Sequence, residues 1–231
     1  MIDMMKYIIL LIVCCSLFGE VKGQTQQLFD EYMNKVGDHS ELYMGKVEYG
    51  YPSTVYMDHP YWMSDDFLEG TVVFNGLLYR NVWFRFDAYL QQLVVKTPVK
   101  GAFVCVPMQK VDGFAWGDMK FIRWNDKFVS LLFDGNRVKL VEQQQLYRKE
   151  RVTDADRAQY GFRRDVKYYV LSDKGEYEVD KLKSVLKLYP EIKKELKTFA
   201  NMNRLDFKEY RGSSLVSMIK YAEALLAKSS K

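Results

Sequence analysis

The stretch of sequence that decides the fold is residues 71–79, Thr-Val-Val-Phe-Asn-Gly-Leu-Leu-Tyr. Its Asn75-Gly76 pair lies between two apolar runs. This is the strongest short-range signal for a β-hairpin, because both central residues of a type I′ turn need positive φ. Residues 82–86 continue the second strand, and Asp87-Ala88 predicts a short bend after it. We therefore expect an antiparallel sheet that begins near residue 70.

The same alternation predicts further strands along the chain. Four of these strands form two hairpins, one around Asp134-Gly135-Asn136 and one around residues 172–175. The polar stretch from 143 to 164, which lies between the two hairpins, is assigned to no strand. Short strands with turn residues between them favour an antiparallel β-meander, either an open sheet or a partly closed barrel. The expected strands are 92–95, 102–106, 111–114, 119–123, 128–133, 137–142, 167–171 and 176–179.

Beyond Asp180 the apolar residues change to helical spacing. Pro190 suits the first turn of a helix, and Gly212-Ser213-Ser214 resembles an N-cap. We expect a C-terminal pair or trio of amphipathic helices packed on the sheet, which predicts an α+β fold. The apolar positions that would face the sheet are Leu182, Val185, Leu186, Tyr189, Ile192, Leu196, Phe199, Leu215, Met218, Ile219, Ala222, Leu225 and Leu226.

These patterns divide the chain into four parts, of which the last three are expected to form one domain, 24–231. They are a signal peptide (1–23), an aromatic-rich N-terminal strap (24–69), an antiparallel β-rich region (70–180) and basic C-terminal helices (181–231). The last part carries 12 Lys or Arg against 5 Asp or Glu, whereas residues 24–180 carry 20 against 23. The spacing of the lysines is typical of a solvated helix face rather than of a surface that binds nucleic acid.

The N-terminus has the profile of a signal peptide, with Lys6, an apolar run over residues 7–18 and a polar end. The run is too short to span a bilayer. Cleavage after Gly23 would leave a mature chain of 208 residues without a transmembrane segment. We expect an exported protein, periplasmic or associated with the outer membrane. A lipoprotein acylated at Cys14 or Cys15 is the alternative, which Val13 disfavours because a small residue normally precedes a lipidated Cys.

Cysteine and histidine usage excludes several classes of site. The mature chain has one cysteine, Cys105, so it can form no intramolecular disulfide. With only two His in the sequence, a Cys/His zinc site is excluded as well. Cys105 lies in an apolar run and is expected to be a small core residue. We expect no metal and no cofactor.

Six aromatic residues within twenty positions are the most unusual feature of the sequence. Rigid amphipathic rings are what a sugar-binding platform or a protein-interaction hot spot uses. The alternative is that the rings cover the end of the sheet as an ordered strap. This candidate binding surface consists of Tyr43, Tyr49, Tyr51, Tyr56, Tyr61 and Trp62.

Two further residues form a candidate polar site. His59 lies near Asp58, Asp65 and Asp66, but a loop with one His and a few acids is more typical of a solvated turn than of a metal site. Asp87 follows a predicted strand, where its carboxylate is expected to cap the bend or to pair with an Arg.

No catalytic motif stands out in the sequence. It has no Gly-x-Ser-x-Gly turn for a nucleophilic Ser. A hydrolase that works through two carboxylates stays as a remote alternative, because two acids at the right separation suffice for that chemistry. The acids available to it in the β-rich region include Glu69, Asp87, Asp112 and Asp118.

Several short elements resemble a family of uncharacterised exported proteins of Bacteroidota. In that family a Leu-Tyr-Asn-Gly element, a His-Pro-Phe-Phe element and a Gly-x-Val-x-Tyr-x-Gly hairpin ending in Tyr-Asp occur in this order. This chain departs from the pattern at Met44, at Tyr61-Trp62 and at Phe86. The resemblance implies an envelope protein of a Gram-negative bacterium and carries no assigned activity. The matching elements are Glu41–Gly45, His59–Trp62, Gly70–Gly76, Arg85–Asp87, Tyr168–Val170, Lys183–Pro190 and Lys193–Lys197.

The sequence therefore predicts a non-enzymatic interaction module of the cell envelope, whose partner is an envelope protein or a glycan. The alternative is a soluble glycan- or lipid-binding protein that uses the aromatics from Tyr43 to Trp62. No nucleic-acid partner is expected, and the oligomeric state is left open.

Overall fold

The computed structural model describes residues 25–33, 35–152 and 158–228. The predicted signal peptide, with Cys14 and Cys15, lies outside these residues. The strands are β1 (Lys46–Val47), β2 (Leu68–Phe74), β3 (Leu77–Asp87), β4 (Gln92–Lys96), β5 (Phe103–Cys105), β6 (Val111–Trp116), β7 (Met119–Trp124), β8 (Lys127–Asp134), β9 (Val138–Val152), β10 (Ala158–Ser172) and β11 (Gly175–Glu178).

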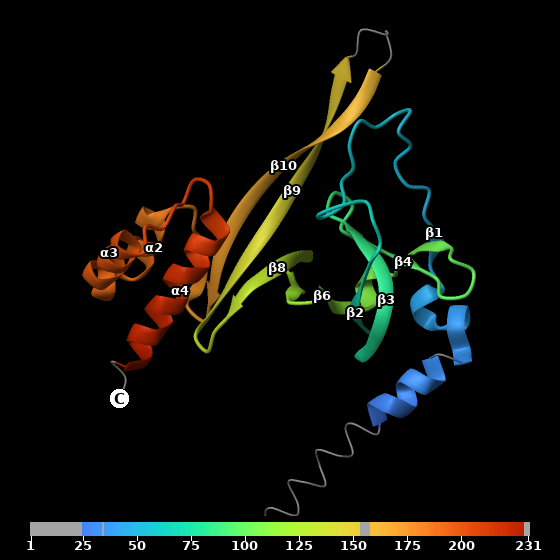
Figure 1. Ribbon diagram of the computed structural model, residues 1–231, viewed down its shortest axis with the longest axis horizontal. Helices are drawn as coiled ribbons and strands as arrows, with labels where there is room; N and C mark the ends of the chain where they lie inside the picture. The colour runs from blue at the N-terminus through green and yellow to red at the C-terminus, as the bar shows by residue number, and fades with distance from the viewer. Residues whose placement is uncertain (1–24, 34, 153–157, 229–231) are drawn as a thin grey trace, which may run out of the picture.

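The strands form one open antiparallel sheet, in the order β1-β5-β4-β3-β2-β6-β7-β8-β9-β10-β11 (Figure 1). From β6 to β11 each strand pairs with the next one along the chain, so this half of the sheet is a meander. Together with the C-terminal helices this confirms the predicted α+β fold, with an open sheet rather than a closed barrel.

The first hairpin forms where the sequence predicts it. Asn75 and Gly76 have φ of 52° and 76°, the left-handed conformation that a type I′ turn requires. On the strand that follows, Val82, Phe84 and Phe86 are buried, which confirms the predicted alternation.

The polar stretch 143–164, assigned to no strand from the sequence, is the largest error of the prediction. Strands β9 and β10 run through it and pair in unbroken register from Val138↔Ser172 to Ala158↔Val152. Two apolar side chains in this stretch, Leu146 and Phe162, are buried in the core. The ladder itself satisfies the backbone, so that sparse apolar residues suffice to place these strands.

Two hydrophobic cores lie on the same face of the sheet. The first is built mainly by β2–β8 and includes Leu146, whereas the second lies under the C-terminal helices and includes Leu140. Since side chains six residues apart on a strand point to the same face, β9 supplies both cores from one face. The long β9–β10 hairpin therefore connects the two parts of the molecule (Figure 1).

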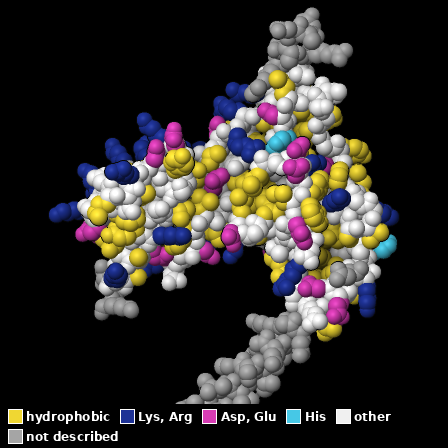
Figure 2. Space-filling model, in the orientation of Figure 1, with side chains coloured by type: hydrophobic (Ala, Val, Ile, Leu, Met, Phe, Trp, Pro, Cys, Tyr) yellow, Lys and Arg dark blue, Asp and Glu magenta, His cyan; other side chains and the backbone are white. Residues whose placement is uncertain are grey.

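The C-terminal helices are α2 (Leu182–Leu188), α3 (Lys193–Met202) and α4 (Arg211–Lys228), with a 3-10 turn at Pro190–Ile192. Pro190 opens the turn that leads into α3, as predicted. Figure 2 shows Lys and Arg side chains spread over this part of the surface. Asn203 ends α3, since its side-chain Nδ2 donates to the carbonyl oxygen of Phe199 (2.9 Å).

The predicted N-cap at Gly212-Ser213-Ser214 is wrong. Helix α4 already begins at Arg211, and Ser214 is buried within it. Its hydroxyl donates to the carbonyl oxygen of Asp206 (2.8 Å), so it ties the helix to the preceding turn instead of capping it. Cys105, expected in the core, is only partly buried.

The N-terminal part, 24–69, is more structured than a strap. It contains a helix over residues 25–33 and 35–36, two 3-10 turns at Gly37–His39 and Glu41–Tyr43, and the edge strand β1. Irregular chain runs from residue 48 to 67 and returns to the sheet at β2.

Two glycines test this packing with opposite expected signs. A Cβ on Gly70 would lie 2.2 Å from the carbonyl oxygen of Ala115, so Gly70→Ala is expected to lower the free energy of unfolding by about 1–3 kcal/mol. At Gly212, in the first turn of α4, a Cβ would be in ordinary contact with the Tyr168 side chain, at 3.4 Å from its hydroxyl and 3.5 Å from its ring, and Gly212→Ala is expected to raise the free energy of unfolding by about 0.5–1 kcal/mol. Urea unfolding measures both; equal effects would contradict the described contacts.

Candidate functional site

The six aromatic residues of the candidate binding surface do not lie on one exposed surface. Tyr61 and Trp62 are 2% and 4% exposed, whereas Tyr49 is 94% exposed. The other three, Tyr43, Tyr51 and Tyr56, are partly buried against the first core. A ring that the protein itself covers cannot stack on a ligand, so the expectation that Tyr61 and Trp62 form an exposed platform is wrong.

The backbone around Tyr61 explains this burial. It runs antiparallel to the end of β3, where the Trp62 N–H donates to the carbonyl oxygen of Phe86 (2.8 Å). In extended chain, neighbouring side chains point to opposite sides. Trp62 therefore enters the first core, 4.9 Å from the ring of Phe121, and Tyr61 turns to the other side, over Arg85.

A few residues before this, the same segment is bound to β10. The Met57 N–H donates to the carbonyl oxygen of Tyr160 (2.8 Å), and the Tyr160 N–H donates to that of Val55 (2.9 Å). Arg164 adds a bond to the carbonyl oxygen of Tyr61 (2.9 Å). Residues 55–62, which we term the closing segment, therefore connect β3 to β10, two strands that are not neighbours in the sheet.

A buried ion pair lies under the closing segment. The Arg85 guanidinium is 2.6 Å from the Glu48 carboxylate, and both side chains are largely buried, at 13% and 8% exposure. The Tyr61 hydroxyl donates to the same carboxylate (2.7 Å), and the guanidinium lies over the Tyr61 ring, 4.0 Å from its centroid. Burial and the bond to Glu48 together raise the pKa of Tyr61.

Asp87 is the second buried charge of this region, at 2% exposure. Its carboxylate accepts hydrogen bonds from the backbone N–H groups of Tyr89 (2.9 Å) and Leu90 (2.8 Å), which confirms that it caps the bend after β3. The Tyr51 hydroxyl donates to its other oxygen (2.5 Å). Burial raises the pKa of Asp87, although these three hydrogen bonds act in the opposite direction.

His59, the other residue of the candidate polar site, does not touch Asp87 through any described hydrogen bond. Its ring stacks on Tyr61 at 5.7 Å between centroids, and its Nδ1 is buried without a hydrogen-bond partner. No group of three or more His, Cys, Asp or Glu suited to a metal ion occurs among the described residues. His59 therefore contacts the Tyr61 ring and Asp87 pairs with the Tyr61 backbone, but no described contact joins His59 to Asp87 in a shared site.

The geometry of this cluster is that of a structural site. The carboxylate of Glu48 is engaged by the Tyr61 hydroxyl and by Arg85, and that of Asp87 by the Tyr51 hydroxyl and two backbone N–H groups. Of the other acids considered for hydrolysis, Asp112 accepts a hydrogen bond from the N–H of Gly76 (2.8 Å) and so supports the first hairpin.

Two of the exposed aromatic residues, Trp83 and Phe103, lie on the face of the sheet opposite the cores. Because Val82, Phe84 and Phe86 point into the core, Trp83 points outward and is 48% exposed. Trp83 is paired with Glu69 on β2 and with Lys96 on β4. Lys96 is paired with Phe103 on β5, which is 41% exposed. The alternation of residues 82–86 in the sequence already indicates that Trp83 points away from the core.

A third ring, that of Phe67, extends this patch, and we term Trp83, Phe103 and Phe67 the outer aromatic face. Phe67 stacks on Phe103 at 4.6 Å between centroids. Tyr49 follows Glu48, whose N–H donates to the carbonyl oxygen of Phe103 (3.0 Å). Because the Glu48 side chain points to Arg85 on this side of the sheet, the next side chain, Tyr49, is not assigned to the face, and none of the six aromatic residues predicted from the sequence forms part of it.

Comparison with known proteins does not assign this site. No protein family, no curated protein and no solved structure matches the chain. Among the described residues, no helix is both long and apolar enough to cross a membrane.

The role of Asp87 is tested by two substitutions. Asp87→Ala leaves the N–H groups of Tyr89 and Leu90 and the Tyr51 hydroxyl without their acceptor, and is expected to lower the free energy of unfolding by about 2–4 kcal/mol. Asp87→Asn keeps an acceptor oxygen and is expected to lower the free energy of unfolding by less than Asp87→Ala. If chemical denaturation shows the same decrease for both variants, Asp87 does not act as a cap.

The pH dependence follows from the raised pKa of Asp87. The folded chain holds this proton more tightly than the unfolded chain, for which the pKa is about 3.9. The group's contribution to stability is therefore largest below about pH 4 and falls as the pH rises through the folded pKa. The measurement is the free energy of unfolding of the wild type and of Asp87→Asn as a function of pH. The wild-type value minus the variant value is expected to fall as the pH rises above about 4. A difference that rises with pH over this range would contradict the prediction.

The buried ion pair gives a third prediction. Glu48→Ala leaves the Arg85 charge buried and is expected to cost about 3–5 kcal/mol, whereas the double variant Glu48→Gln, Arg85→Met is expected to cost less than this single change. The control is Glu41→Ala, which removes an exposed pair with Lys110 and is expected to cost under about 1 kcal/mol. Thermal unfolding measures the stability of these three variants. If Glu48→Ala destabilises the protein no more than Glu41→Ala, the buried pairing is contradicted.

Proposed function

We propose that this chain is an exported cell-envelope protein, periplasmic or associated with the outer membrane, that acts as a non-enzymatic interaction module. The signal-peptide profile of residues 1–23 and the resemblance to exported proteins of Bacteroidota support the location. Its partner is a protein of the envelope, bound on the outer aromatic face.

The observation that carries this proposal is the exposure of Trp83. A tryptophan at 48% exposure in the paired part of β3 leaves a large apolar surface in water, and Phe103, at 41% exposure, lies on the same face two strands away. Trp and other aromatic residues dominate the binding energy of protein interfaces, usually near their centre and surrounded by polar residues. Glu69 and Lys96 supply such surroundings here.

Charge favours a protein over an anionic polymer as the partner. The face carries one acid and one base in register on either side of Trp83, so it has no strong charge of one sign. An envelope protein that offers an apolar cluster flanked by both charges would match it.

Contacts within the protein fix Arg85, which points to the same face as Trp83 and lies two residues further along β3. Its guanidinium is paired with Glu48 and lies 4.0 and 4.6 Å from the rings of Tyr61 and Phe67. Arg85 therefore loses little side-chain freedom when a partner covers this face, which favours affinity.

The test is cross-linking in intact cells with a tag placed after Lys231, followed by recovery and identification of the partner. Trp83→Ala is expected to lower the recovery of one reproducible envelope protein at least about tenfold, as for a hot-spot residue. The matched control is Tyr210→Ala, which removes an exposed ring (66%) before α4 and is expected to leave recovery unchanged.

The glycan alternative is separated by a second measurement. If the purified chain binds soluble envelope glycans and Trp83→Ala abolishes that binding, the outer aromatic face is a sugar platform and the protein-partner proposal fails. Equal recovery with Trp83→Ala and Tyr210→Ala would also contradict it.

A further inference from the structure

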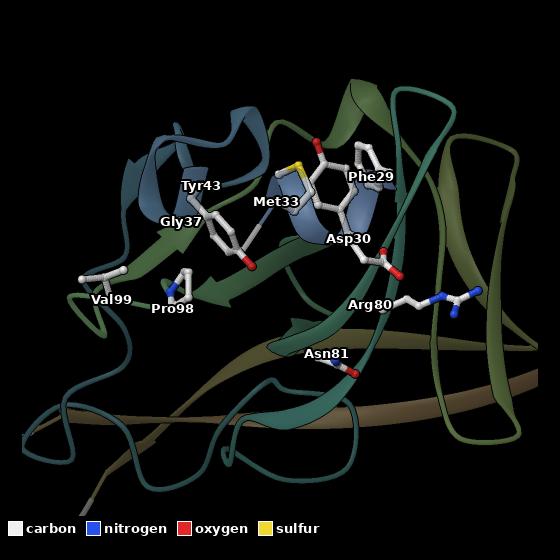
Figure 3. Close-up of a pocket in the computed structure, with 10 residues that line it drawn as sticks. Phe29, Asp30, Met33, Gly37, Tyr43, Arg80, Asn81, Pro98 and Val99 are labelled. Carbon is white, nitrogen blue, oxygen red and sulfur yellow. The ribbon is translucent and has the colours of Figure 1, made fainter. Parts of the chain in front are cut away.

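A hollow of about 180 Å³ lies between the N-terminal helix and β3 (Figure 3). The helix contributes Phe29, Asp30 and Met33, the turn after it contributes Tyr43, and the loop after β4 closes the remaining side. It is separate from the outer aromatic face. Sites for drug-sized ligands measure about 300–1,000 Å³, so the occupant of this hollow is small.

The frame of the hollow is fixed by specific contacts. The Asp38 carboxylate accepts hydrogen bonds from the backbone N–H groups of Val99 (2.9 Å) and Lys100 (3.0 Å), which holds the loop in place. On the other side, the Gln26 side chain donates to the carbonyl oxygen of Leu78 on β3 (3.1 Å). Phe29 packs edge-on against Tyr79 at 5.4 Å. The site is therefore formed before any ligand arrives.

The lining combines aromatic rings with unused polar groups. In Figure 3 the Tyr43 ring comes from one side with its hydroxyl directed into the hollow, across from Phe29, Met33 and Asp30. None of the described residues hydrogen-bonds to this hydroxyl, although burial raises the pKa of Tyr43 to about 12. A partly buried hydroxyl without a partner is available to a ligand.

Asp30 supplies the complementary acceptor. Its Oδ1 already receives a hydrogen bond from the Gln26 side chain (2.8 Å), so that the carboxylate has capacity for further donors. Arg80 and Asn81 of β3 also border the hollow, but the Arg80 side chain extends away from it. The groups that line the hollow thus include the Tyr43 hydroxyl, the Asp30 carboxylate, the Asn81 side chain and three aromatic rings, those of Phe29, Tyr43 and Tyr79.

We infer that this hollow binds one neutral sugar residue, free or at the end of a glycan. Aromatic rings pack against the apolar face of a sugar ring, while vicinal hydroxyls donate to a carboxylate and accept from a phenol. An acidic sugar would meet Asp30 without a facing cation. The inference does not depend on the outer aromatic face, so it can fail while the proposed function stands.

The experiment is isothermal titration of the purified full chain with the methyl glycosides of glucose, galactose, mannose and N-acetylglucosamine, and with glucuronic acid. At least one neutral glycoside is expected to bind, and glucuronic acid to bind at least tenfold more weakly. Tyr43→Phe removes only the unpartnered hydroxyl, and is expected to weaken binding about tenfold without lowering the melting temperature.

A blocking variant ties the binding to this hollow. Val99 lines it and is 77% exposed, so Val99→Trp can fill the space without disturbing the core and is expected to abolish binding. The matched control is Leu90→Trp, at an exposed position (61%) of the β3–β4 turn, which is expected to leave binding unchanged.

Three results would overturn the inference: no neutral glycoside binds, binding survives in Val99→Trp, or free phenylalanine competes for the site better than every neutral glycoside. The last result would indicate an amino acid site. Because the outer aromatic face is intact in all these variants, partner recovery from cells is expected to be unaffected by any of them.

Discussion

The carboxylate of Asp87 is the constraint on which the rest of the structure depends. At 2% exposure it accepts two backbone N–H groups of the bend after β3 and the hydroxyl of Tyr51, so one side chain joins the sheet to the irregular chain that precedes it. From there the closing segment reaches β10 and covers the first core. A buried carboxylate is costly unless each oxygen is hydrogen-bonded, and here both are.

This arrangement also explains which surface is left for other molecules. Both hydrophobic cores use one face of the sheet, and at β3–β5 the opposite face is only partly covered, by Tyr61 and Phe67 over Arg85. Trp83 lies beyond that cover, and Phe103 is stacked on Phe67 at its edge. The same contacts that bury Tyr61 hold Arg85 in place beside Trp83, so a residue expected to bind ligands instead supports a surface formed by others.

The parts that the sequence predicts correctly are those with local causes. Asn75-Gly76 needs positive φ, Asp87 caps a bend three residues long, and Pro190 opens the turn before α3. The N-cap placed at Gly212–Ser214 is a local error, whereas the larger errors concern contacts between distant residues. Nothing near Tyr61 in the sequence indicates that its neighbours pair with β3, and the strands through 143–164 depend on a ladder that apolar alternation does not mark. The pocket at Tyr43 likewise requires a helix and a strand about 50 residues apart.

The most direct test of the account is a double-mutant cycle between Tyr51 and Asp87, measured by urea unfolding of the wild type, Tyr51→Phe, Asp87→Ala and the double variant. If the 2.5 Å hydrogen bond fastens the N-terminal chain to the sheet, the coupling free energy is expected to be about 1.5–3 kcal/mol, as for a hydrogen bond to a charged group. A coupling near zero would mean that the two side chains act independently, and that Asp87 stabilises only its own bend.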